Sequence, residues 1–131
     1  MSTSFRYYWP AILWALFILI ICSIKLGEVA ESPLFFAGFD KLVHCGLFFV
    51  IALFMATGYT RKKAQPFVSI TALITAVIIA TIYGGTIELL QRYFFPWRSA
   101  DWNDLFADII GILMAVFSIF ITSKALGHEK K

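Results

Sequence analysis

Residues 67–94 read FVSITALITAVIIATIYGGTIELLQRYF, an apolar run in which only Glu88 and Arg92 are charged. A helix rises about 1.5 Å per residue, so a run of this length can cross the roughly 30 Å hydrocarbon core of a bilayer. The apolar residues are continuous and do not alternate with polar ones, which argues against a strand of a membrane barrel. The run therefore predicts a membrane-spanning helix.

Three further apolar runs, at residues 7–24, 42–59 and 104–121, have the length of a membrane-spanning helix. The composition agrees, because 60% of the 131 residues are hydrophobic and only 15% are charged, whereas about a quarter of the residues in a soluble domain are charged. A domain this small cannot bury so much apolar surface in water. We predict an all-α membrane protein, a bundle of four transmembrane helices that forms one domain over residues 1–131.

Positive charge gathers at one end of the predicted bundle. Seven Lys and Arg residues fall in the two terminal tails and the loop at 61–66, and four fall at the opposite ends of the helices. Because Lys and Arg are enriched in cytoplasmic loops, we predict that both termini are cytoplasmic. The net charge of +3 follows from this placement and gives no reason to expect a nucleic-acid partner.

Polar residues recur near the predicted outer ends of the second and third runs. Asp40 and His44 are four residues apart and share a helix face, with Lys41 beside it. Glu88 lies inside the third run, where an ionised and unpaired carboxylate costs several kcal/mol. Small residues share the face of Glu88, and Gln91 lies near it, so this face is predicted to point into the bundle. The small residues are Ala76, Ala80 and Gly84.

The fourth run adds a stripe of acids. Asp101, Asp104 and Asp108 lie on one side of a helix, and small residues continue the stripe. Those small residues, which we expect to be buried, are Gly111, Ala115 and Ser118. Asp101 is a candidate helix cap, whereas Asp108 is predicted to belong to a buried polar site. Arg98, in the preceding turn, can bind a phosphate or carboxylate through two parallel hydrogen bonds.

Together these residues predict an outward-facing polar pocket just beneath the outer surface. The candidate ligand-binding residues are Asp40, Lys41, His44, Glu88, Gln91, Arg98, Asp101, Asp104 and Asp108. His44 and Glu88 are the candidate acid–base pair and are expected to act as one unit, with Asp40 orienting the imidazole. The alternative is a hydrogen-bonded plug that only orients the helices. No metal site or cofactor is predicted, although an acid-rich pocket with one His is also able to hold a divalent cation.

At these positions the sequence resembles the VanZ-like family of small bacterial membrane proteins. The matching pattern is Asp40-Lys41-x-x-His44, then Glu88-x-x-Gln91, then Arg98-Ser-Ala-Asp101-Trp-Asn-Asp104-x-x-x-Asp108-x-x-Gly111. Family members commonly have Asn where this chain has Asp108. The resemblance implies a multi-pass protein of the bacterial cytoplasmic (inner) membrane, a role in the cell envelope, and an effect on susceptibility to the glycopeptide teicoplanin.

The sequence favours a binding protein over an enzyme. An outward-facing pocket suits the polar head of an amphiphile, such as a lipid-linked cell-wall precursor or a lipoglycopeptide, and the lipid bilayer is the other expected partner. The alternative is an intramembrane acid/base or metal-assisted enzyme acting on a lipid-linked envelope substrate, although the sequence contains neither GxSxG nor HExxH. A transporter would require a dimer, and a homo-oligomer or a structural partner of another membrane protein are further alternatives.

Overall fold

The computed structural model describes residues 4–24, 36–97 and 100–128. This part of the chain contains four helices and no strand: α1 (Phe5–Ser23), α2 (Phe39–Lys62), α3 (Ile70–Phe94) and α4 (Trp102–His128). Each helix is long and apolar enough to cross a membrane, so the predicted class, an all-α bundle of four membrane-spanning helices, is confirmed. The helix ends differ from the predicted runs, since α2 begins at Phe39 rather than Leu42, α3 begins at Ile70 rather than Phe67, and α4 continues beyond Ile121.

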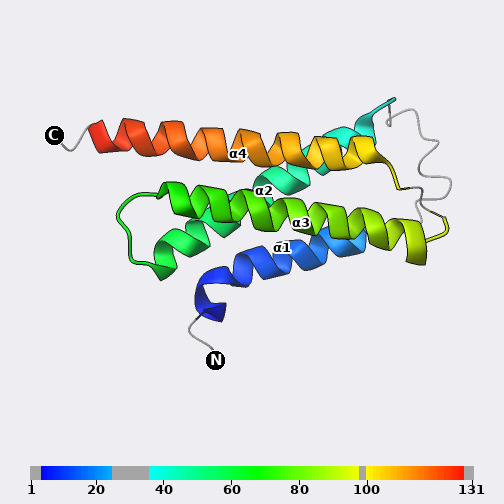
Figure 1. Ribbon diagram of the computed structural model, residues 1–131, viewed down its shortest axis with the longest axis horizontal. Helices are drawn as coiled ribbons and strands as arrows, with labels where there is room; N and C mark the ends of the chain where they lie inside the picture. Colours follow the sequence, from blue (N-terminus) through cyan, green and yellow to red (C-terminus); the bar gives the residue numbers. More distant parts are fainter. Residues whose placement is uncertain (1–3, 25–35, 98–99, 129–131) are drawn as a thin grey trace.

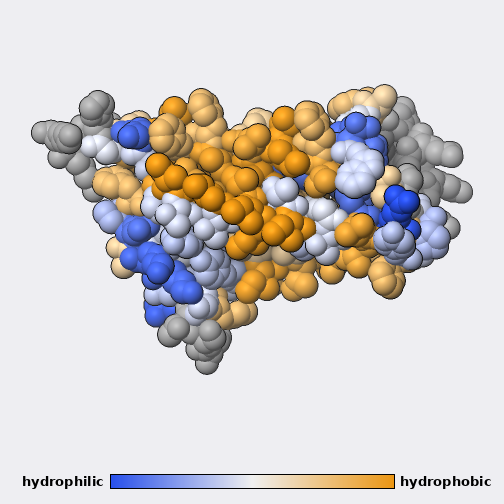
Figure 2. All heavy atoms as spheres, viewed as in Figure 1, coloured by the Kyte–Doolittle hydropathy of each residue, from blue (hydrophilic) through white to orange (hydrophobic). Residues whose placement is uncertain are grey.

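Successive helices run in opposite directions, as Figure 1 shows. Both termini and the connection between α2 and α3 therefore lie at one end of the bundle, which we call the terminal end. The last turns of α1 and α3 and the first turns of α2 and α4 lie at the other end, which we call the site end. Apolar side chains cover the middle of the molecule between these two ends in the view of Figure 2.

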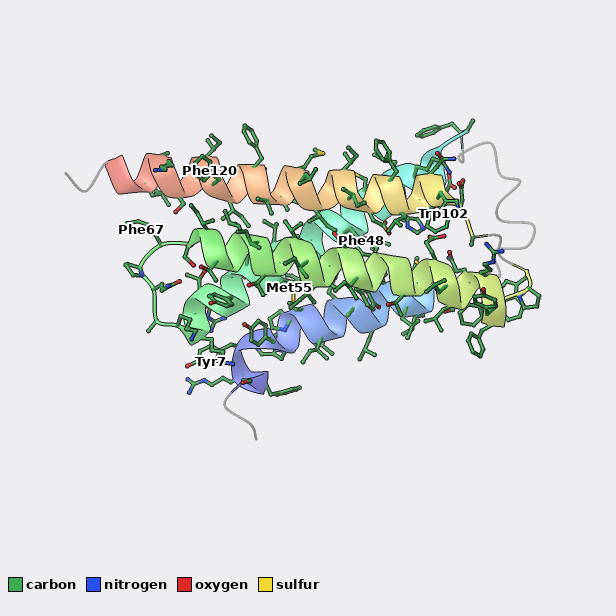
Figure 3. All side chains as sticks on the ribbon, viewed as in Figure 1. Tyr7, Phe48, Met55, Phe67, Trp102 and Phe120 are labelled. Carbon is green, nitrogen blue, oxygen red and sulfur yellow. The ribbon has the colours of Figure 1, made fainter. Side chains whose placement is uncertain are left out.

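The core contains side chains from all four helices. Ile18, Phe48, Ile87 and Ile112, one from each helix, are almost completely buried. Phe48 lies near the middle of the bundle in Figure 3. Many other large apolar side chains are exposed along the outer faces of the helices. Exposed apolar surface of this extent on long helices is suited to contact with lipid acyl chains.

Helices α2 and α4 approach each other closely at Gly111. A Cβ atom at this position would overlap the backbone carbonyl of Cys45 on α2. Only glycine leaves room for the two backbones at this separation. The contact fixes the first turns of α2 against the first turns of α4, which is where the polar residues lie.

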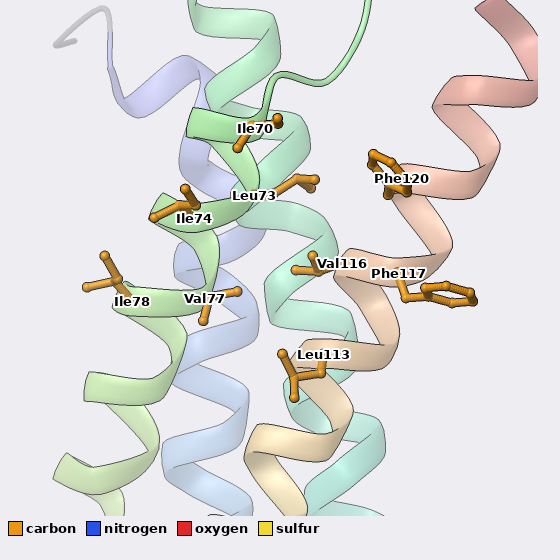
Figure 4. A pocket seen from close by; sticks show the side chains of 9 residues that line it. All are labelled: Ile70, Leu73, Ile74, Val77, Ile78, Leu113, Val116, Phe117 and Phe120. Carbon is orange, nitrogen blue, oxygen red and sulfur yellow. The ribbon is translucent and has the colours of Figure 1, made fainter.

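An apolar groove separates α3 from α4 toward the terminal end (Figure 4). Its volume is about 440 Å³. The residues that line it are Ile70, Leu73, Ile74, Val77, Ile78, Leu113, Val116, Phe117 and Phe120. None of the predicted site residues belongs to this groove.

Candidate functional site

Three helices bring their predicted polar residues to the site end of the bundle. Gly38 has a φ of +86°, the left-handed region that favours glycine, and α2 begins directly after it. Asp40 and Lys41 therefore lie in the first turn of α2, with His44 about one turn further in. The other members are Glu88 and Gln91 near the end of α3, Asp101 just before α4, and Asp104 and Asp108 in its first turns. Arg98 lies outside the described residues.

Lys41 holds the outer acids together. Its Nζ donates to Asp101 Oδ2 at 2.9 Å, to Asp104 Oδ1 at 3.0 Å and to Asp40 Oδ2 at 3.2 Å. Asp104 is buried, whereas the other two acids are more accessible. The Lys41 ammonium therefore connects α2 to the first turn of α4 through charge-assisted hydrogen bonds.

Asp101 connects α4 to α3 as well as to α2. Its Oδ1 accepts a hydrogen bond from the backbone amide of Asn103 at 2.9 Å, so the predicted capping role is confirmed. Its own backbone amide donates to Glu88 Oε2 at 3.0 Å. The hydrogen bonds from the Asn103 backbone and from Lys41 hold the pKa of the Asp101 carboxyl below its usual range. Asp101 is therefore ionised at neutral pH while it orders the start of α4.

His44 pairs with Asp108 across the α2–α4 contact. Nδ1 of His44 lies 2.9 Å from Oδ1 of Asp108, and both side chains are buried. The other ring nitrogen, Nε2, lies 3.9 Å from Oδ2 of Asp104. Asp40, which we expected to orient the imidazole, is exposed and bonds Lys41 instead. Asp108 therefore takes the orienting position that the sequence suggested for Asp40.

Glu88 points into the bundle, as its small-residue face predicts. It is only 5% exposed, and Ala76, Ala80 and Gly84 are buried with it. One ligand atom from each of His44, Glu88 and Asp108 can be chosen so that all three lie within 4.8 Å of one another. The expected closeness of His44 and Glu88 is therefore present, with Asp108 as a third member. We call these three residues the inner triad.

Three buried oxygen atoms at the site end have no hydrogen-bond partner among the described residues. They are Glu88 Oε1, Gln91 Oε1 and Asp108 Oδ2. Gln91 uses its Nε2 to donate to the backbone oxygen of Cys22 on α1, at 3.2 Å. A buried acceptor without a partner costs about 1–3 kcal/mol, and more when the group is charged. A ligand that supplies hydrogen-bond donors or positive charge would remove this cost and would gain binding affinity from doing so.

One feature of the site was missed by the sequence analysis, and one prediction of burial on α4 was wrong. Gly84 is close enough to the acids that a Cβ there would lie 2.9 Å from Asp108 Oδ2, so it provides room for that carboxylate. The four-residue spacing of small residues indicated a packed face but gave no sign of which side chain it would meet. Ser118, which we expected to be buried, is exposed, and its hydroxyl donates to Met114 O within α4.

A family model described as VanZ/LLP1 matches residues 3–123, nearly the whole chain. No curated protein and no solved structure matches the chain.

Proposed function

Because the chain belongs to the VanZ/LLP1 family, we propose that it is a bacterial cell-envelope protein that binds the polar head of an amphiphile at its site end. The observation that carries this proposal is the inner triad, in which Glu88 Oε1 and Asp108 Oδ2 are buried without hydrogen-bond partners among the described residues. Ionisable groups inside a membrane-spanning bundle are costly, so they mark sites of function more often than they serve packing alone.

The position of the triad suits a ligand that enters from the membrane surface. The triad lies in the outer turns of α2, α3 and α4, with the accessible Lys41–Asp101 pair above it. In the proposed orientation, with both termini in the cytoplasm, this end faces the outer leaflet of the cytoplasmic membrane. A lipid-linked cell-wall precursor and a lipoglycopeptide such as teicoplanin both combine an acyl anchor with a polar head, so both fit this arrangement.

A second candidate is an intramembrane enzyme that acts on a lipid-linked envelope substrate. The His44–Asp108 hydrogen bond favours it, because a carboxylate on one ring nitrogen fixes the imidazole tautomer and leaves the other nitrogen for proton transfer. Glu88 would then be the second acid–base group. Formation of a product from the lipid substrate distinguishes this candidate from simple binding.

The test compares Glu88→Gln with Glu129→Gln, the same substitution in the C-terminal tail. We expect Glu88→Gln in nanodiscs to weaken binding of teicoplanin or of a lipid-linked wall precursor by about tenfold or more, since a hydrogen bond to a charged group is worth about 1.5–3 kcal/mol. Binding is measured by titration of nanodiscs that contain monodisperse protein. Unchanged affinity of Glu88→Gln for both probes, or no binding by the unmodified chain, would refute the proposal.

A further inference from the structure

The inner triad contains two acids and one histidine, so even a protonated His44 offsets only one of the two carboxylates. Glu88 and Asp108 are 5% and 0% exposed, and no Lys or Arg in the described ranges forms a salt bridge with either of them. Lys41 is already shared among three other carboxylates. Burying two carboxylates is expensive unless a cation lies close to them.

We propose that His44, Glu88 and Asp108 form a binding site for one divalent transition-metal ion, with ligand preferences that fit Zn²⁺. Imidazole nitrogen and carboxylate oxygen are both ligands of Zn²⁺, and a set of three protein ligands leaves a fourth coordination position open. A dication also neutralises the two buried carboxylates while His44 remains neutral.

The separation between His44 and Asp108 is close to that of two ligands on one ion. Zn–ligand bonds of about 2.1 Å at angles of about 90–110° place neighbouring ligand atoms roughly 3.0–3.4 Å apart. The His44 Nδ1 and Asp108 Oδ1 atoms are 2.9 Å apart. One ligand atom from each of the three residues can be chosen so that all lie within 4.8 Å of one another. Metal binding would therefore require side-chain rotation that shortens the longest of these separations.

Neighbouring groups hold the proposed ligands in place. The Asp101 backbone amide donates a hydrogen bond to Glu88 Oε2, and Glu88 Oε1 is left available to the ion. Asp104, held by Lys41, lies beside the second nitrogen of His44. A hydrogen-bonded partner such as the Asp101 amide orients a metal ligand and raises affinity, and the Asp104 carboxylate 3.9 Å from His44 Nε2 adds negative charge beside the imidazole. Gly84 keeps space beside Asp108 Oδ2, the other atom without a partner.

This inference deepens the proposed function, because the open coordination position would bind a phosphate or carboxylate of the headgroup. The ion site itself does not depend on any headgroup. Metal binding with no amphiphile binding would refute the proposed function alone, and amphiphile binding by protein that takes up no metal would refute the ion site alone.

The experiment uses Zn²⁺ alone as the probe. The full chain is purified in detergent through a tag without histidine, in a His128→Gln background, so that His44 is the remaining histidine. We expect one ion per chain by calorimetry and elemental analysis. Glu88→Gln and Asp108→Asn should each weaken binding by more than the roughly 10- to 100-fold that loss of an outer partner causes. The control variant, Glu129→Gln, removes a carboxylate of the C-terminal tail and should bind as the parent does.

X-ray absorption of Zn²⁺ bound to the parent tests the same site without any variant in the triad. We expect an imidazole signal and ligand distances of about 2.0–2.2 Å. A ligand shell without imidazole would overturn the proposal. Equal loss of affinity in Glu129→Gln and Glu88→Gln, or the absence of stoichiometric binding, would overturn it as well.

Discussion

Lys41 is the residue on which the outer part of the site depends. It is the cation shared by three carboxylates, and two of them, Asp101 and Asp104, come from the start of α4. The sequence placed Lys41 beside the face of Asp40 and His44 but could not show what it bonds. Partners 60 or more residues away become neighbours only through the packing of α2 on α4.

Lys41→Met should destabilise the protein by about 1–2 kcal/mol, because Asp104, with a side chain only 6% exposed, loses its counter-ion. This loss is smaller than the roughly 3–5 kcal/mol that follows when one partner of a fully buried ion pair is removed. The reason is that the Lys41 side chain is 35% exposed, so water screens part of the interaction. Midpoints of SDS-induced unfolding in mixed micelles measure the change.

The matched control is Lys63→Met, which removes an exposed cation at the terminal end. The free energy of unfolding of this variant should lie within about 0.5 kcal/mol of that of the unmodified chain. Equal effects of the two substitutions would show that the ammonium contributes no specific interaction at the site end.

The partner of His44 shows where reasoning from residue spacing stops. Residues four apart on a helix are neighbours, which made Asp40 the expected partner on the same helix. In the structure the closer acid is Asp108, which reaches His44 from the facing helix. Both residues were predicted as members of the site, but the pairing depends on the distance between two helix axes, and that distance is not encoded in a spacing.

At the scale of elements, the contact between α2 and α4 determines the geometry of the site. The small-residue stripe of α4 was predicted correctly at Gly111 and Ala115, which are buried. It was wrong at Ser118, because α2 and α4 diverge beyond Ala115. A groove with Ser118 in its lining opens there between the two helices. A periodic stripe predicts which face of a helix packs, but the crossing of two straight helices limits how far along the stripe they touch.

Gly111→Ala should destabilise the bundle by about 1–3 kcal/mol, since the new Cβ overlaps the Cys45 carbonyl and must push α4 away from α2. It should also weaken Zn²⁺ or headgroup binding, because His44 and Asp108 lie on opposite sides of this contact. Unfolding midpoints and ligand titrations on the same preparation give the two effects.

Gly46→Ala is the control for this substitution. A Cβ at Gly46 would meet nothing within 4 Å, so the change should be neutral, or stabilising by up to about 1 kcal/mol through helix propensity. If Gly111→Ala were as stable as Gly46→Ala, the close approach of the two helices would not be what sets their packing.

At the scale of the whole molecule, most of the fold could be predicted from the sequence. Four successive apolar runs of sufficient length predict helices that cross the membrane in alternating directions. The helix ends were less predictable. Hydropathy alone assigns the charged residues Asp40 and Lys41 to a loop, but both belong to α2. Their charged side chains are satisfied by pairing with each other and by the hydrogen bonds of Lys41 to the start of α4.

The charge distribution of the folded chain predicts its orientation in the membrane. Arg61, Lys62 and Lys63 lie at the terminal end, and the acids of the site gather at the other. The positive-inside rule therefore predicts that the terminal end lies in the cytoplasm. Single cysteines introduced by Ala100→Cys or Gln65→Cys, each exposed, test this in a chain whose two native cysteines are replaced by alanine. In intact bacteria an impermeant thiol reagent should label the cysteine at position 100 and leave position 65 unlabelled until the cells are permeabilised. The reverse pattern would turn the inner triad toward the cytoplasm, where neither a wall precursor nor an external glycopeptide could reach it from the outer leaflet.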